Sequence, residues 1–103
     1  MNLNNYLPLT ETTFYVMLSL TEPGHGYVIM QKVEKLSEGN VRIAAGTMYG
    51  AIENLTKQKL IEAVPTDDKR RKVYQLTEIG RSVLKLEVER LKYLVKVAEE
   101  IEF

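Results

Sequence analysis

The 103-residue chain contains no cysteine, a single histidine and three prolines, and it has no long hydrophobic run. Without cysteine, it can form neither disulfide bonds nor thiolate metal sites, a composition that suits a reducing compartment. No apolar segment approaches the roughly 20 residues of a membrane-spanning helix, and no signal-peptide pattern opens the sequence. We therefore expect a cytoplasmic protein without membrane partners.

Side chains that could perform catalysis or bind a metal are also scarce. No carboxylates cluster around His25, so a structural or phosphate-facing role at a helix start is a better interpretation than a metal ligand. One histidine and three serines in separate elements cannot assemble a nucleophile, a base and an orienting group. The Asp67-Asp68 pair falls in an expected exposed turn, a poor environment for acid–base catalysis. We expect no enzyme, no metal and no cofactor.

The length fits one domain, and the net charge of zero hides an uneven distribution. Residues 40–77 carry seven basic and four acidic side chains, a net charge of +3, whereas both flanking segments are net negative. Phosphate binding depends on such a local field and not on the charge of the whole chain. The middle of the chain is therefore the candidate for contact with a polyanion.

The hydrophobic pattern of the first half predicts two helices. Residues 1–7 are expected to form a mobile lead-in, and Thr10 is a suitable N-cap for the first helix, which residues 22–24 (Glu-Pro-Gly) stop. This helix is apolar almost all round, so we expect it to be buried on more than one side. The second helix opens at residues 25–27 and ends near Gly39. Its expected inward stripe is Ile29, Met30, Val33 and Leu36.

A central helix over residues 46–59 follows a short extended segment expected at residues 41–43. Gly50 and Asn54 lie on its outward face, where an exposed glycine costs about 1 kcal/mol relative to alanine. Close approach to another molecule would offset this cost, and an asparagine there can hydrogen-bond a base edge. A solvated helix face with an incidental glycine is the alternative. The expected buried face of this helix is Met48, Ala51, Ile52 and Leu55.

The pattern over residues 60–76 predicts a β-hairpin. Strands are expected at residues 60–64 and 71–76, joined by a polar turn over residues 66–70, and Thr77 caps a final helix that runs to the C-terminus. The order is helix, helix, short strand, helix, hairpin, helix. It predicts a mainly α protein with a small β-hairpin, a winged helix-turn-helix followed by a long C-terminal dimerisation helix.

This final helix carries more apolar surface than one small domain needs. About 25 residues reach about 38 Å, which exceeds the span of the remaining chain. A partner chain is therefore expected to cover part of the apolar stripe, and a helix packed only on its own core is the alternative. The stripe is widened by Val83, Leu86, Tyr93 and Val97. The expected dimer interface comprises Phe14, Leu84, Val88, Leu91, Leu94, Val95, Ala98 and Ile101.

Four basic residues, 69–72 (Lys-Arg-Arg-Lys), follow one another at the tip and return of the expected hairpin. A charge run is usually a solvated turn, and Asp67-Asp68 would partly cancel its field. In a winged helix, however, this tip lies beside the DNA backbone and can place Arg or Lys in the minor groove. The position of the run favours a nucleic-acid contact.

Several ordered motifs resemble those of the PadR-type transcriptional regulators. The resemblance covers about residues 7–103 and implies a homodimeric bacterial DNA-binding repressor of the family's smaller size class. It also allows a small hydrophobic effector at the dimer seam, although no residue identifies one. The motifs are His25-Gly26-Tyr27, residues 46–52 (Gly-Thr-Met-Tyr-Gly-Ala-Ile), Leu60-Ile61, the basic wing and residues 74–81 (Tyr-Gln-Leu-Thr-Glu-Ile-Gly-Arg).

The resemblance implies that residues 46–59 form the recognition helix, within a DNA-binding domain of residues 1–77. Residues 78–103 would be the dimerisation helix, joined to that domain as one structural unit. Ala44-Ala45 replace the family's usual Ser-Pro, so a hydroxyl N-cap worth about 1 kcal/mol is missing. The residues expected to contact a double-stranded DNA operator are Tyr27, Thr47, Tyr49, Gly50, Asn54, Lys57, Lys69, Arg70, Arg71 and Lys72.

Two other functions fit parts of the same pattern. A winged-helix module that binds protein instead of DNA would not need Lys57 and residues 69–72 on one face, which a DNA-binding protein does need. An all-helical dimeric adaptor would require that residues 60–76 form no hairpin. Both alternatives are therefore distinguished by the placement of the hairpin and its charges.

Overall fold

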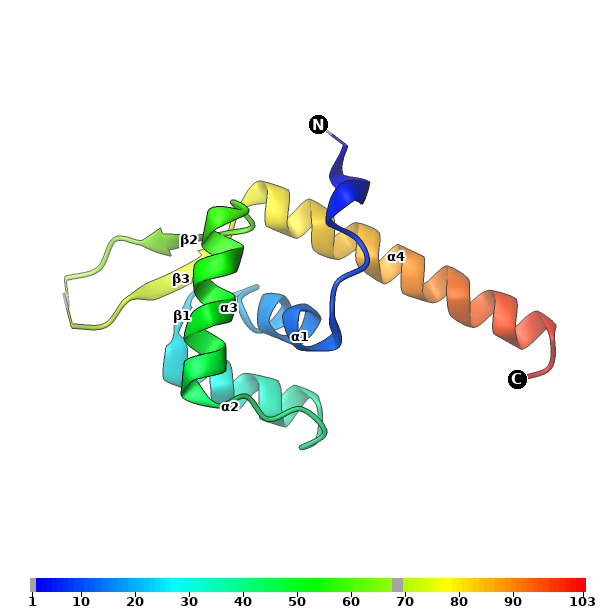
Figure 1. The fold of residues 1–103 in the computed structure, drawn as a ribbon, viewed down its shortest axis with the longest axis horizontal. Helices are drawn as coiled ribbons and strands as arrows, with labels where there is room; N and C mark the ends of the chain where they lie inside the picture. The colour runs from blue at the N-terminus through cyan, green and yellow to red at the C-terminus, as the bar shows by residue number, and fades with distance from the viewer. Residues whose placement is uncertain (1, 68–69) are drawn as a thin grey trace.

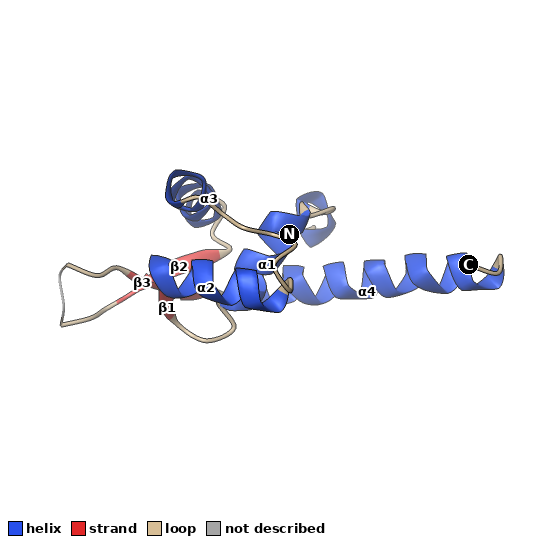
Figure 2. Ribbon diagram, turned by 90° about the horizontal axis from the view of Figure 1, so that it is seen from below, coloured by secondary structure: helices blue, strands red, loops and turns tan. Residues whose placement is uncertain are grey.

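The computed structural model describes residues 2–67 and 70–103. A small sheet lies at one side of the helices, and the β2–β3 hairpin and α4 project in opposite directions (Figures 1 and 2), which gives extents of 53 × 35 × 20 Å. In chain order, the elements are the 3-10 helix η1 (Leu3–Tyr6), α1 (Glu11–Ser19), β1 (Gly24–His25), α2 (Gly26–Leu36), α3 (Ala45–Lys57), β2 (Ile61–Val64), β3 (Val73–Leu76) and α4 (Glu78–Glu100). This is the predicted winged helix-turn-helix with a long C-terminal helix.

Threonine side chains cap the first and last helices, as the sequence predicts. The hydroxyl oxygen of Thr10 accepts a hydrogen bond from the N–H of Thr13 at 3.1 Å, and that of Thr77 accepts one from Gly80 at 2.9 Å. Each bond satisfies a backbone donor that the first helical turn leaves without a partner. Ala44, at the start of α3, makes no such side-chain bond, so its side chain does not cap the first turn of this helix.

The sheet is antiparallel with the strand order β1-β3-β2 over the described part of the chain. β2 and β3 form the predicted hairpin, in which Ile61 pairs with Leu76. The strand expected at residues 41–43 is not formed: these residues carry no strand pairing, and Ser37 hydrogen-bonds both the N–H and the carbonyl of Val41 instead. The additional strand is β1 instead, which pairs with the free edge of β3.

Helix ends also differ from the expected boundaries. α3 ends at Lys57, before the expected Lys59, because Lys59 adopts a φ of 64°. The N–H groups of Lys59 and Leu60 then bond back to the carbonyls of Thr56 and Leu55, a C-capping arrangement that usually uses glycine.

Leu36, expected to face inward, is 51% exposed at the last position of α2. The described part of the expected lead-in, residues 2–7, is not simply a lead-in, because η1 packs against α4.

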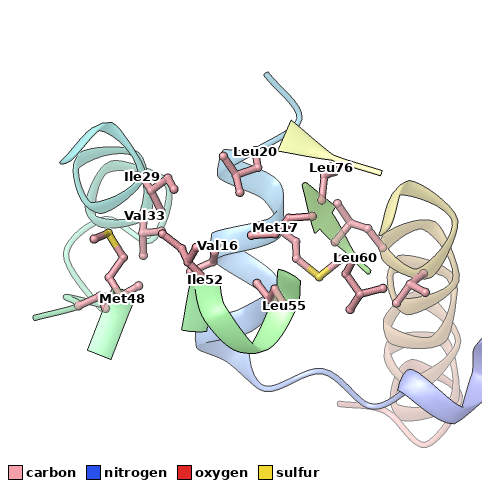
Figure 3. Close-up of a cluster of buried hydrophobic side chains, with 14 residues drawn as sticks. Val16, Met17, Leu20, Ile29, Val33, Met48, Ile52, Leu55, Leu60 and Leu76 are labelled. Carbon is pink, nitrogen blue, oxygen red and sulfur yellow. The ribbon is translucent and has the colours of Figure 1, made fainter. Parts of the chain in front are cut away.

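The hydrophobic core lies where α1, α2, α3 and the sheet meet (Figure 3), and α1 lies between α2 and α4. The predicted buried face of α3 is confirmed for Met48, Ile52 and Leu55, whereas Ala51 is only partly buried. α4 adds Val83 and Leu84 to the same cluster, so it is anchored in the core along its first half. The labelled core side chains of Figure 3 are Val16, Met17, Leu20, Ile29, Val33, Met48, Ile52, Leu55, Leu60 and Leu76.

The start of α4 is fixed against the end of α3 by close backbone contact. The N–H of Thr77 donates to the carbonyl of Leu60 at 3.1 Å, and its hydroxyl donates to the carbonyl of Lys59 at 2.6 Å. A Cβ atom at Gly80 would lie 2.0 Å from the carbonyl oxygen of Leu60, so only glycine permits this approach. α4 therefore begins at a close-packed junction with the end of α3.

Candidate nucleic-acid interface

The outward face of α3 is open and polar. A Cβ atom built at Gly46 or Gly50 meets nothing within 4 Å, so neither glycine is required by packing inside the chain. Thr47 and Asn54 are exposed on the same helix, and Lys57 makes an exposed ion pair with Glu53 at 3.4 Å, an interaction that contributes little to stability. This side of α3 can therefore approach another molecule closely along its backbone.

A groove of about 700 Å³ separates α3 from the hairpin. Its floor is apolar, with Ile52 on α3 and with residues of β2 and β3. Lys57 and its ion-pair partner Glu53 line it from α3, together with Tyr49, and Arg71 and Lys72 line it from the hairpin. Cations from both elements therefore face one channel.

A second cavity of about 510 Å³ lies between the hairpin and the start of α2. Tyr27, Tyr49 and the basic wing residues line it, and the tyrosines are 65% and 62% exposed. Gly26 allows α2 to pack closely here, because a Cβ atom at this position would lie 2.7 Å from Met48 Cε. The lining residues are His25, Gly26, Tyr27, Tyr49, Arg70, Arg71, Lys72 and Tyr74.

The described wing residues Arg70, Arg71 and Lys72 are exposed, as expected for a hairpin tip that meets a polyanion. Lys69, another expected contact, lies outside the described residues. Sequence reasoning did not place Tyr74 at this site. Its assignment to a returning strand was correct, but the cavity reaches it only because β1 and β3 pair beside the start of α2.

The C-terminal half of α4 exposes a row of apolar side chains. Leu91, Leu94, Val95 and Ile101 are 37–66% exposed, while Phe14, Val88 and Ala98 are partly buried. Leu84 was expected at the interface, but it is only 7% exposed and packs in the core of the chain itself. Phe14, Val88, Leu91 and Val95 line a groove of about 430 Å³ with Lys92, Lys96 and Glu99.

One carboxylate is buried near this groove. Glu87 is 1% exposed and accepts hydrogen bonds from Arg90 and from the N–H of Leu9 at 2.7 Å. The hydrogen bond from Arg90 lowers the pKa of Glu87 more than burial raises it. Among residues 2–67 and 70–103, no group of three or more His, Cys, Asp or Glu side chains could hold a metal ion. Over the same residues, no helix has the length and hydropathy needed to cross a bilayer.

The chain is similar to several solved structures. A transcriptional regulator from Clostridium thermocellum is 22% identical, with a TM-score of 0.72 and coverage of 97% of this chain and 93% of that one. A PadR-like transcription factor from Bacteroides fragilis is 26% identical, with a TM-score of 0.70 and 87% coverage of both chains. BpsR from Bordetella bronchiseptica is 21% identical, with a TM-score of 0.69 and coverage of 90% of this chain and 69% of that one.

No curated protein sequence matches the chain. The family model described as "Transcriptional regulator PadR-like family" matches residues 14–86, a range that contains most of α1, all elements from β1 to β3 and the first part of α4. These residues include the core, the outward face of α3 and the wing, so the family match and the winged-helix geometry coincide. The chain belongs to the PadR-like family of transcriptional regulators.

Proposed function

We propose that this protein is a homodimeric repressor that binds a pseudo-palindromic DNA operator. The observation that carries the proposal is the groove between α3 and the hairpin, where Lys57, Arg71 and Lys72 face the same channel. A winged helix that enters the major groove with α3 brings its wing to the adjacent backbone or minor groove. The sugar–phosphate backbone that separates the major groove from the minor groove of the DNA then runs along the channel.

The channel suits a sugar–phosphate backbone in its chemistry as well as in its position. Its apolar floor can pack against deoxyribose, and its rim of cations can contact the phosphates on either side. Tyr27 and Tyr49 are exposed and line the second cavity, and Thr47 is exposed on α3, so all three would add neutral hydroxyl donors to further phosphates. These contacts position the protein without selecting a sequence.

Sequence selection is assigned to the outward face of α3. The open space at Gly46 and Gly50 lets the helix backbone approach the floor of the major groove. Asn54 lies one turn after Gly50, and its amide can pair with adenine, an interaction worth about 1–3 kcal/mol of discrimination.

The dimer is assigned to α4. Residues 1–77 would provide the DNA-binding part and residues 78–103 the dimerisation helix, while Val83 and Leu84 keep both parts in one core. The exposed row from Leu91 to Ile101 is too apolar to be left in water, and a second copy of the same helix matches it. A two-fold dimer reads two half-sites in opposite orientation, hence a pseudo-palindrome.

We place the effector in the groove beside Phe14 and Leu91, which the partner's α4 would close into a seam. Its apolar walls and volume of about 430 Å³ suit a small hydrophobic molecule. For BpsR, regulation of DNA binding by 6-hydroxynicotinic acid has been described. An effector at this seam would release this repressor if it bound the DNA-free form more tightly than the DNA-bound form.

The two alternative functions fare differently. An all-helical adaptor is excluded, because β2 and β3 form the hairpin. A protein-interaction module without DNA binding does not require cations from α3 and the wing in one groove, and this placement favours DNA.

The test is selection of genomic fragments by the full-length protein, followed by competition against random DNA. We expect an enriched two-fold symmetric site. Asn54→Ala should then relax the preference at one base pair per half-site, whereas Tyr49→Phe should weaken specific and nonspecific binding by similar factors. If no site is enriched, the protein is not a sequence-specific regulator. If Asn54→Ala leaves every base preference unchanged, this residue does not read the sequence.

A further inference from the structure

The N-terminal arm, residues 3–9, connects two elements that are far apart in the sequence. The hydroxyl of Tyr6 donates a hydrogen bond to the carbonyl of Gln58 at 3.2 Å. Gln58 is the C-cap residue of α3, so this bond attaches the arm to the end of the recognition helix. The N–H of Leu9 donates to the Glu87 carboxylate, which attaches the arm to the middle of α4. In Figure 1 the arm (blue) crosses α4.

The attachment at Glu87 is built as a fixed point. Its carboxylate is 1% exposed, and Arg90 donates to both of its oxygens, so its position is determined from two sides. The bond to Leu9 is charge-assisted, which makes it stronger than an ordinary backbone bond. Glu87 is also the last buried residue of α4, so the helix leaves the domain directly beyond this point.

Two attachments define the direction in which α4 leaves the domain. The junction at Gly80 and Leu60 fixes one point of the helix, and the arm fixes a second point about 10 Å further along, at 1.5 Å per residue. From Gly80 to Ile101 the helix is about 31 Å long, so a rotation of about 6° moves its far end by about 3 Å. This displacement is close to one base-pair step of about 3.4 Å.

We propose that the arm sets the separation of the two recognition helices in the dimer, and thereby the half-site spacing that the protein selects. This inference rests on the proposed dimeric function. Tyr6 and Glu87 are positioning residues: neither meets DNA, but each fixes the angle between α3 and α4. Half-sites of this kind lie about 34 Å apart. A change in the angle between α3 and α4 in each protomer would therefore move the two recognition helices away from that separation.

The chain has no cysteine, so a single Glu53→Cys substitution gives one spin label per protomer on the exposed face of α3. Pulsed electron–electron resonance on the free full-length protein then measures the distance between the two recognition helices. We expect a narrow distribution in the parent. In this background, Tyr6→Phe and Glu87→Gln should shift or broaden the distribution, by about 3 Å for a rotation of α4 of about 6°. The matched controls Tyr15→Phe and Glu89→Gln should leave it unchanged.

The outcomes separate this inference from the proposed function. If the parent gives a dipolar signal and both variants show the same distance distribution as the parent, the arm does not position α3 and the inference is wrong. The proposed dimer would still stand. If the parent gives no dipolar signal at micromolar concentration, the dimer itself is wrong and the inference falls with it. Thermal melts show whether each variant is folded, and Tyr6→Phe tests the idea even if Glu87→Gln does not fold.

Discussion

Replacing Gly50 by leucine should separate stability from DNA binding. A Cβ atom at this position meets nothing within 4 Å, so the larger side chain can project into solvent without strain in the free protein. Leucine favours a helix over glycine by roughly 0.5–1 kcal/mol. For a chain of this size, that gain should raise the melting temperature by about 2–8 °C.

Binding should change in the opposite direction. The leucine side chain would stand between α3 and the floor of the major groove, so the helix would have to withdraw. Asn54 would then lose its base contact, worth about 1–3 kcal/mol in each half-site. Over two half-sites this loss is about 2–6 kcal/mol, so we expect operator affinity to fall at least about 30-fold.

The assay combines thermal melts with competition binding on operator and random DNA. Gly50→Ala is the matched control, because it removes glycine's helix penalty but adds only one methyl group, and it should keep most of the operator affinity. If Gly50→Leu binds the operator as tightly as the wild type, α3 does not enter the groove as proposed.

Three further predictions concern assembly and stability. Leu91→Glu combined with Val95→Glu should give monomers in sedimentation at micromolar concentration, because both side chains are exposed on α4; an unchanged dimer would place the interface elsewhere. Gly80→Ala should lower the free energy of unfolding by roughly 1–3 kcal/mol, because its Cβ would overlap a backbone carbonyl that cannot move away easily. Denaturant titration measures this loss, and wild-type stability would show that the junction can adjust. Since the hydrogen bond from Arg90 lowers the folded pKa of Glu87, its stabilisation is present above the unfolded pKa near 4.5 and is lost as pH falls through the folded value. Glu87→Gln should therefore flatten the acid-induced decrease in stability below about pH 4.5, and an unaltered pH profile would contradict this assignment.

Much of the fold is encoded in local signals that the sequence displays. Thr10 and Thr77 precede polar first turns and apolar stripes, and both act as the expected caps. The buried face of α3 follows from helical spacing alone, and the hairpin follows from a polar turn between two short apolar runs. These features depend on neighbours within a few residues, so they can be read without a three-dimensional structure.

Features that depend on distant partners could not be read in this way. β1 has two residues, the first of which is the glycine of the Pro23-Gly24 stop, and it is a strand only because β3 offers it a free edge. The burial of Glu87 requires Leu9, 78 positions earlier, to come back across α4. The lead-in interpretation of residues 1–7 failed for the same reason, since the Tyr6–Gln58 bond joins positions 52 residues apart.

The interface shows both cases. Lys57, Arg71 and Lys72 were predicted from helical spacing and a charge run, Tyr49 was implied by the family resemblance, and the structure places all four around one groove. Tyr74 was missed, because its position at the second cavity depends on sheet pairing.

The salt dependence of operator binding tests DNA recognition by this groove most directly. If Arg71 and Lys72 contact phosphates in both protomers, removing them with Arg71→Ala and Lys72→Ala should reduce the log–log slope by up to about 3.6, at about 0.9 per contact. Lys35→Ala with Lys85→Ala changes the net charge equally at exposed positions outside the groove, and it should leave the slope nearly unchanged. Equal slopes for the wild type and the Arg71/Lys72 variant would contradict the proposal that DNA follows this groove.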